Sequence, residues 1–238
     1  MAYTTEIFKD YLGHDTDSAY LKVHKANQES YEDNFSDLLP KSTQAKILEI
    51  GCGAGQLLFY LKQKGYRNIE GIDIGDEQAE MVRKMGISAV SINSIPEYLK
   101  DKKSSYDLII MNQVIEHLSK EVLLDNLRAI RSALKEGGLF VFATPNMACL
   151  SGSFQRDIDF THEIGLTERN AHQVMRVAGF KDIMIRGDRV SFKPRIKRIV
   201  WAVLNRLWHS TLGFIYYIER GSDRPRVLSK ELIVAGKK

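Results

Sequence analysis

A glycine-rich turn after a short apolar stretch places the strongest constraint on how this chain folds. Residues 47–50 are apolar apart from Glu49, glycines follow at positions 51, 53 and 55, and residues 56–61 have the composition of a helix. A strand, a glycine turn and a helix in this order present backbone N–H groups to a nucleotide-like ligand at the carboxyl edge of a parallel sheet. Because glycine lacks a Cβ atom, it accepts positive φ and lets a ligand approach the main chain. The turn therefore predicts an α/β protein with a ligand site at this edge.

The spacing of the turn departs from the dinucleotide-binding fingerprint, because Gln56 stands where that fingerprint has its third glycine. Asp73 stands at the end of the next predicted strand, 22 residues after Gly51. An acidic residue about 20 positions after the first glycine accepts hydrogen bonds from ribose hydroxyls in nucleotide-binding folds. The other interpretation is a surface residue that caps the helix beginning near residue 76. With the glycines in register, we expect Asp73 to bind a ribose.

Glu49 lies inside the apolar strand, where a carboxylate is rarely buried without a partner. A ligand with a positive end, such as a sulfonium or an ammonium group, would supply that partner. A lysine of the chain itself is the alternative, and the residues alone leave both open.

Apolar strands alternate with helical stretches from residue 46 onward, which predicts a Rossmann-like, seven-stranded, mostly parallel sheet flanked by helices. The strands are expected at 46–50, 68–73, 87–92, 106–111, 139–143, 180–186 and 227–235, and the helices at 55–64, 76–85, 96–99, 121–135 and 167–178. A chain of 238 residues suits one such domain, over residues 41–238. Residues 1–40 form a polar helical segment, either a lid over the site or, as we prefer, a packing arm.

Four stretches of the chain together resemble the class I S-adenosylmethionine-dependent methyltransferases. They are Glu49-Ile50-Gly51-Cys52-Gly53-Ala54-Gly55, Gly71-Ile72-Asp73, Val114-Ile115-Glu116-His117-Leu118 and Leu134-Lys135-Glu136-Gly137-Gly138-Leu139-Phe140. The resemblance covers roughly residues 46–187, and the last strand fits as well. It implies an enzyme of that fold with S-adenosyl-L-methionine as cofactor.

By this resemblance the three turn glycines pass against the methionine portion of the cofactor, and Asp73 holds the ribose. Asn93 stands where the family usually has an aspartate that contacts the adenine amino group, which is a departure from the pattern. Asn112 and Gln113 are expected on the methionine side, near the transferred methyl group. The expected cofactor contacts also include Cys52, Ile74 and Ser94.

Methyl transfer to an oxygen benefits from a base, and histidine titrates near neutrality. We favour His162, in a polar loop after the fifth strand, with Asp159 available to orient it. His117 is the second candidate, although packing under the cofactor is the more common role at its position. Neither histidine has the spacing of a CxxC or HxxxH metal motif, so no metal site is expected.

The acceptor is predicted from two features. Residues 111–114 lack the Asn/Asp-Pro-Pro-aromatic motif of methyltransferases that act on nucleobase or glutamine nitrogens. The stretch from 144 to 180 resembles a subgroup that modifies sugars in bacterial surface polysaccharides. The prediction is O-methylation of a sugar or a lipid-linked glycan. The alternatives are a hydrophobic small molecule such as a quinone precursor, or a membrane-recruited cofactor-binding protein without turnover.

Residues 188–226 form a basic, amphipathic insertion between the last two strands. The stretch 186–226 contains ten lysines and arginines against three acidic residues, while the whole chain has a net charge of only +4. Asn205, Arg206 and His209 interrupt its apolar pattern, which argues against a membrane span. Binding to a membrane surface through 193–222 and a pocket cap or homodimer contact remain open, while nucleic acid binding is disfavoured. Two cysteines and no visible secretory signal predict a cytoplasmic protein, with the inner face of the membrane as the alternative location.

Overall fold

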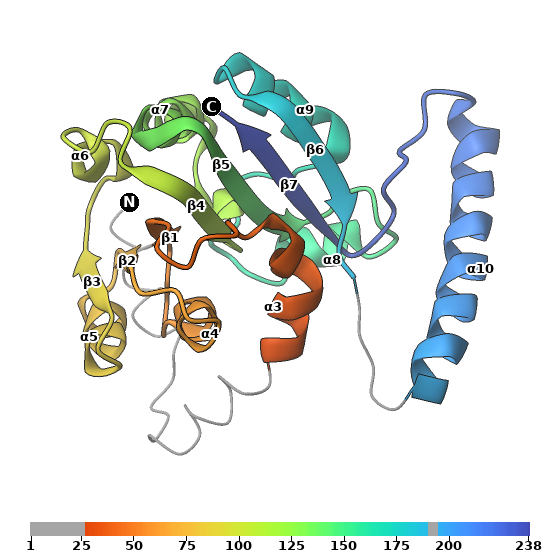
Figure 1. Ribbon diagram of the computed structural model, residues 1–238. Helices are drawn as coiled ribbons and strands as arrows, with labels where there is room; N and C mark the ends of the chain where they lie inside the picture. Colours follow the sequence, from red (N-terminus) through yellow and green to blue (C-terminus); the bar gives the residue numbers. More distant parts are fainter. Residues whose placement is uncertain (1–26, 190–194) are drawn as a thin grey trace.

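The computed structural model describes residues 27–189 and 195–238. Its centre is a seven-stranded sheet (Figure 1). The strands are β1 (Ile47–Ile50), β2 (Ile69–Asp73), β3 (Ser88–Ser91), β4 (Tyr106–Asn112), β5 (Leu134–Pro145), β6 (Lys181–Gly187) and β7 (Glu231–Lys237). Their order is β3-β2-β1-β4-β5-β7-β6. Only β7 runs antiparallel to its neighbours β5 and β6, and the other pairs are parallel. The predicted Rossmann-like, mostly parallel sheet is confirmed.

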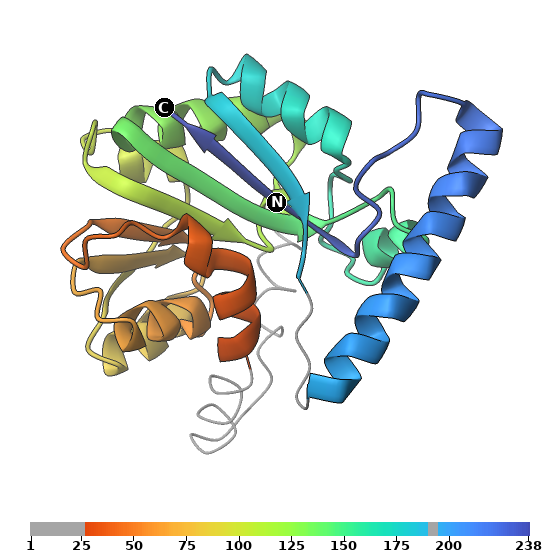
Figure 2. The same ribbon diagram turned by 45° about the vertical axis from the view of Figure 1, so that its right-hand side comes forward.

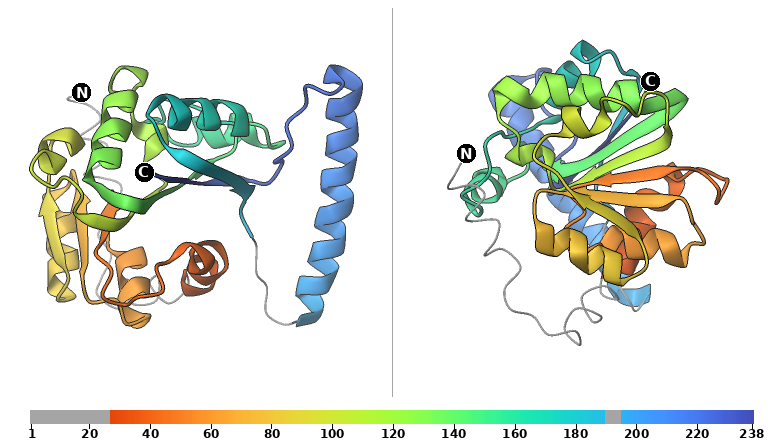
Figure 3. Two further views of the ribbon diagram at one scale, coloured as in Figure 1. Left: turned by 45° about the horizontal axis from the view of Figure 1, so that its top comes forward. Right: turned by 90° about the vertical axis from the view of Figure 1, so that its left-hand side faces the viewer.

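Helices cover both faces of this sheet (Figure 3). The helices of the described residues are α3 (Gln28–Phe35), α4 (Gln56–Gln63), α5 (Asp76–Lys84), α6 (Ile95–Leu99), α7 (Lys120–Ala133), α8 (Gly152–Asp157), α9 (Glu168–Val177) and α10 (Arg195–Arg220), with 3-10 turns η1 (Ser36–Leu38) and η2 (Ile115–His117). One apolar cluster joins the sheet to α6, α7 and α9, and a second joins it to α3, α4 and α5. Alternate residues of β4 enter the two clusters, which explains its continuous apolar sequence.

Two element boundaries differ from the sequence prediction. The helix expected over 121–135 ends at Ala133, and β5 already begins at Leu134. The pairing of β4 with β5 shifts between Tyr106 and Leu108, so Gly137 with φ +73° lies within a bulge of β5 and does not end the helix. The last strand begins at Glu231 and not at Val227, because the backbone of Val227 donates to the Glu168 carboxylate at the start of α9.

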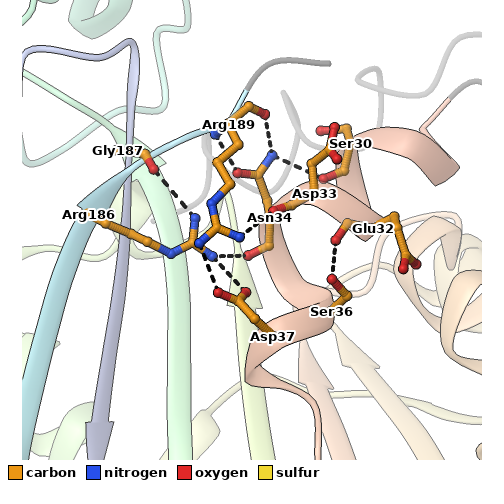
Figure 4. Close-up of polar contacts among 9 residues, drawn as sticks. All are labelled: Ser30, Glu32, Asp33, Asn34, Ser36, Asp37, Arg186, Gly187 and Arg189. Carbon is orange, nitrogen blue, oxygen red and sulfur yellow. Dashed lines mark hydrogen bonds and ion pairs between the residues drawn. The ribbon is translucent and has the colours of Figure 1, made fainter. Parts of the chain in front are cut away.

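Helix α3 is fastened between the glycine-turn helix and the end of β6. Tyr60 of α4 donates to Glu32 at 2.7 Å. On the other side Arg186 donates to the Asn34 carbonyl and, with Arg189, contacts the Asp37 carboxylate (Figure 4). These contacts hold α3 at one edge of the sheet. The rest of the expected 1–40 segment, residues 1–26, lies outside the described residues.

Helix α10 stands apart from the two helix layers, at the β6–β7 side of the molecule (Figure 2). Leu212 is buried and Tyr216 donates to the carbonyl of Ala148, so the face carrying these residues is turned to the domain. A helix repeats every 3.6 residues, which places Val203, Leu207 and Phe214 on the opposite face. These three side chains are 55–62% exposed. Within the described part of the chain, no helix has the length and apolarity needed to cross a membrane.

Candidate active site

All three glycines of the turn have left-handed backbone conformations, and two of them leave no room for a side chain. Gly51, Gly53 and Gly55 have φ of +70°, +48° and +80°. A Cβ atom on Gly51 would lie 2.2 Å from Cγ2 of Val114, and one on Gly55 would lie 2.4 Å from Cε of Met85. At Gly53 a Cβ would meet no atom within 4 Å. Packing against Val114 and Val82 thus disfavours a side chain at the two outer glycines, and the backbone at Gly53 is open to approach by a ligand.

Asp73 connects the end of β2 to this turn. One carboxylate oxygen accepts the N–H of Gly53 at 2.8 Å, and the other accepts the N–H of Gly75 at 3.0 Å. Each carboxylate oxygen keeps a second lone pair, so both can also accept hydroxyl donors. The side chain is thus fixed by the turn it supports, and it has the acceptors that ribose binding requires.

Glu49 is buried beneath the turn, with 3% of its surface exposed. Burial and the nearby Asp73 raise the pKa of its carboxyl well above the usual range, while the backbone of Leu58 donates to it. The oxygen Oε2 has no hydrogen-bond partner. Among the described residues no lysine or arginine forms an ion pair with Glu49, so the lysine alternative finds no support there. A buried acceptor without a partner fits a ligand that carries a positive charge.

The remaining predicted cofactor contacts fall at the same edge of the sheet, with different exposure. Cys52 is buried, and Ile74 is 48% exposed. Asn93 is exposed, and the hydroxyl of Ser94 caps helix α6 by accepting the Glu97 N–H. Asn112 ends β4 and Gln113 follows it; Gln113 adopts a positive φ of 55°, and its N–H donates to the Ala143 carbonyl.

A cavity of about 270 Å³ opens beside Asn112 and Gln113. Helix α3 forms one wall, and the ends of β4, β5 and β7 form the other. Its lining residues are Asn27, Ser30, Tyr31, Asn34, Phe35, Gln56, Asn112, Gln113, Ala143, Glu231 and Ile233. Most of them carry hydrogen-bonding groups. Burial, followed by the nearby Asp188, raises the pKa of Glu231.

His117 and His162, 45 residues apart in the sequence, lie side by side with ring centroids 4.8 Å apart. Nδ1 of His117 lies 2.8 Å from the Thr161 hydroxyl, which donates to the Asp159 carboxylate at 2.7 Å. Nδ1 of His162 faces the carbonyls of Gln155 and Arg156. Asp159 therefore reaches His117 through Thr161. Burial, with a smaller contribution from His162, lowers the pKa of His117.

Glu116 completes this cluster. Its side chain is 2% exposed, Oε2 accepts the Thr144 hydroxyl at 3.0 Å, and Oε1 has no hydrogen-bond partner. Burial raises the pKa of its carboxyl to about 8. Its backbone carbonyl accepts the N–H groups of Glu163 and Ile164, which ties the loop after β5 to the end of β4.

The sequence analysis missed Glu116 and the polar residues of α3 as parts of the site. Glu116 stands beside His117, and a carboxylate that follows the apolar residues Val114 and Ile115 was a usable signal of the kind applied to Glu49. No comparable signal marks Asn27, Ser30 or Asn34, because a polar helix has the same sequence pattern whether its polar side chains face solvent or a cavity.

Fold and turn together define the Rossmann-like methyltransferase architecture, and comparison with known proteins agrees. Residues 23–194 match the family described as "Methyltransferase domain", so the chain belongs to the class I S-adenosylmethionine-dependent methyltransferases. A SAM-dependent methyltransferase from Archaeoglobus fulgidus superposes with a TM-score of 0.63 at 20% identity over 92% of this chain and 94% of that one. Phosphoethanolamine N-methyltransferase 2 of Haemonchus contortus, in complex with S-adenosyl-L-methionine, gives 0.61 at 18% identity over 97% of this chain and 60% of its own.

Curated relatives match a smaller part of the chain. Ubiquinone biosynthesis O-methyltransferase of Saccharophagus degradans is 28% identical over 118 residues, 48% of this chain and 49% of that protein. Ribosomal protein L11 methyltransferase of Porphyromonas gingivalis is 29% identical over 128 residues, 51% of this chain and 40% of that protein. The chain thus spans about half the length of the first of these relatives and less of the second. S-adenosyl-L-methionine is the cofactor of the family, and the open backbone at Gly53 and the unpartnered oxygen of Glu49 fit it.

Replacing Gly53 by alanine should mainly affect cofactor binding, whereas replacing Gly51 by alanine should mainly affect stability. Gly53→Ala adds a methyl group in the space left for the cofactor, so we expect cofactor affinity to fall about tenfold or more, and stability to fall by only about 1 kcal/mol. Gly51→Ala forces a collision with Val114 and should lower the free energy of unfolding by about 3 kcal/mol. Calorimetric titration with S-adenosylmethionine and urea unfolding measure the two quantities. Equal loss of stability in both variants would contradict this division of roles.

Proposed function

We propose that this enzyme transfers a methyl group to a hydroxyl oxygen of a sugar or a lipid-linked glycan. The observation that carries the proposal is the cavity beside Asn112 and Gln113, which is lined mainly by amide, hydroxyl and carboxyl groups. Small-molecule pockets are usually lined by apolar side chains with few polar groups. A lining of this polarity suits an acceptor that carries many hydroxyls.

The reaction needs few chemical groups from the protein. S-adenosylmethionine, when bound, supplies a methyl group on a sulfonium sulfur: the C–S bond breaks as the C–O bond forms, and S-adenosylhomocysteine leaves. The residues must hold the acceptor hydroxyl in line with that bond and take up its proton. His162, in the loop after β5, is the proposed base; it is not among the residues that line the cavity, so the acceptor has to extend from the cavity to reach it. Asp159 and Thr161 are positioning residues, since they orient the neighbouring His117.

A hydrophobic small molecule, such as a quinone precursor, is the second candidate acceptor. Several curated relatives are named ubiquinone biosynthesis O-methyltransferases, which supports an oxygen acceptor of this kind. Their matches cover about half of this chain. The exposed apolar face of α10 would also suit an enzyme that meets hydrophobic substrates at a membrane.

The acceptor classes can be separated by product detection. Full-length protein is first titrated with S-adenosylmethionine in a calorimeter, and then incubated with radiolabelled cofactor and either cell-surface glycan extracts or hydroxylated quinone precursors. Label in the glycan fraction supports the proposal, and label only in the quinone fraction selects the second candidate. Tight cofactor binding without transfer to either fraction would favour a binding protein without turnover.

We further propose that α10 docks this enzyme on an anionic membrane surface. Its apolar face points away from the domain, and no described residue covers it. Ile196, Val200 and Leu204 on the same side are 53–74% exposed. Lys197 and Arg206 are exposed at the two borders of this face by helical geometry, where long cationic side chains can reach lipid headgroups.

Leu207→Glu should weaken binding to vesicles that contain phosphatidylserine by about tenfold or more, because it loses apolar burial and adds repulsion from the surface. Ala202→Glu introduces the same charge at an exposed position outside the apolar face and is the matched control. Co-sedimentation at low and high salt measures the difference. Equal sedimentation of both variants would refute membrane docking. If Leu207→Glu instead converts a dimer to a monomer in light scattering, the face pairs with a second copy of the chain.

A further inference from the structure

We infer that Glu116, His117 and His162 form a binding site for a divalent transition-metal ion, with Zn²⁺ as the best-fitting ion. One ligand atom from each residue lies within 4.8 Å of the others. The three residues come from the η2 turn after β4 and from the loop after β5, two segments at the carboxyl edge of the sheet. The spacing of the histidines in the sequence predicts no metal site, but the fold joins two histidines that are 45 positions apart.

The hydrogen bonds around the two imidazoles determine which nitrogen carries the lone pair. The Thr161 hydroxyl has a single proton and donates it to Asp159, so it must accept from Nδ1–H of His117. Nδ1 of His162 faces two carbonyl oxygens, which only accept. Both rings therefore carry their proton on Nδ1 and their lone pair on Nε2. A histidine that binds metal through one nitrogen usually donates its other N–H to an oxygen in this manner.

The third ligand is a buried carboxylate with an unused acceptor. Oε2 of Glu116 is occupied by the Thr144 hydroxyl, while Oε1 is buried and has no hydrogen-bond partner. A polar atom buried in this way costs free energy unless something binds it. A cation held between Oε1 and the two imidazoles would satisfy that oxygen.

Two imidazoles and one carboxylate form a ligand set typical of catalytic zinc, which keeps a further coordination position open. Mg²⁺ and Ca²⁺ prefer oxygen ligands throughout and suit this set less well. Around a tetrahedral ion with bonds near 2.0–2.1 Å, ligand atoms lie about 3.3 Å apart. Binding must therefore draw the three atoms together by up to about 1.5 Å, a movement that small changes of side-chain rotation supply.

The catalytic consequence rests on the proposed function, whereas metal binding itself does not. A metal ion engages the same Nε2 lone pair that His162 needs to act as a base. With the ion bound, the acceptor hydroxyl would occupy the open coordination position and would release its proton to solvent water at lower pH, as metal-bound oxygens do. His162 would then serve as a ligand and not as the proton acceptor.

Metal binding is tested on the full-length protein without any acceptor. Chelator-treated protein is dialysed against Zn²⁺ and its content measured by mass spectrometry, and Co²⁺ is titrated while its visible absorption is recorded. We expect one Zn²⁺ per chain, and at least about 100-fold weaker binding in His162→Ala and in Glu116→Gln. Thr161→Val should weaken it by about 10–100-fold, because it removes the partner that orients His117. His172→Ala, an exposed histidine on α9, should bind Zn²⁺ as the unchanged protein does.

Circular dichroism and cofactor calorimetry check that each variant is folded. If Glu116→Gln does not fold, Zn²⁺ binding by His162→Ala alone tests whether the metal site exists. Failure to bind Zn²⁺ below about 100 µM would overturn the inference, and so would a bound Zn²⁺ that His162→Ala leaves in place. If Zn²⁺ binds as expected but no acceptor is methylated, the proposed function fails while the metal site stands.

Discussion

Replacing Asp73 by alanine is expected to lower the affinity for S-adenosylmethionine by about 100-fold, equivalent to about 2.7 kcal/mol. The carboxylate accepts the N–H groups of Gly53 and Gly75, and it is the proposed acceptor for the ribose hydroxyls. Each hydrogen bond to a charged group contributes about 1.5–3 kcal/mol, so losing the ribose contacts and loosening the turn together account for the effect. Calorimetric titration of the two proteins with cofactor measures it.

Asp76→Asn is the control for Asp73→Ala, because it removes a carboxylate charge three residues further along, at the exposed start of α5. It should bind the cofactor within about threefold of the unchanged protein, since Asp73 is the one of these two residues that accepts an N–H of the glycine turn. If Asp73→Ala retains full affinity, Asp73 caps the loop before α5 and does not bind the ribose.

Replacing His162 by alanine is expected to lower the rate of methyl transfer by about 100-fold to 10,000-fold, the range that a positioned proton acceptor contributes. His162 lies in the loop after β5, where its ring contacts His117 and its Nδ1 faces the carbonyls of Gln155 and Arg156, so cofactor affinity should stay within about twofold. The rate is measured under single-turnover conditions with saturating cofactor, once an acceptor has been found.

His172→Ala provides the comparison for His162→Ala, because His172 is exposed on α9 and outside the cluster. Its rate should be unchanged. A full rate in His162→Ala would remove His162 from the reaction, either as a base or as a metal ligand. Metal content separates those two roles when the rate does fall: loss of Zn²⁺ together with activity indicates a ligand, and loss of activity alone indicates a base.

The order of strands and helices could be predicted because the signals are local. Apolar runs of four to seven residues alternate with amphipathic helices, and Gly51, Gly53 and Gly55 mark a turn whose positive φ values other residues rarely adopt. The errors occurred where long-range pairing decides. β5 begins at Leu134, before Gly137 and Gly138, because its register with β4 includes a bulge. Val227 stays outside the sheet because Glu168 binds its backbone.

The candidate site likewise has a part that could be predicted from local sequence and a part that depends on long-range packing. The sequence by itself determined the candidate cofactor edge, because Glu49, the glycines and Asp73 occupy fixed positions toward the ends of two neighbouring strands. Only the tertiary structure placed His162 beside His117 and Glu116, since the ends of β4 and β5 meet at one edge of the sheet although 45 residues separate the histidines. It also showed that α3 lines the cavity and that α10 turns its apolar face outward. Those relations depend on packing between distant segments, which no local pattern records.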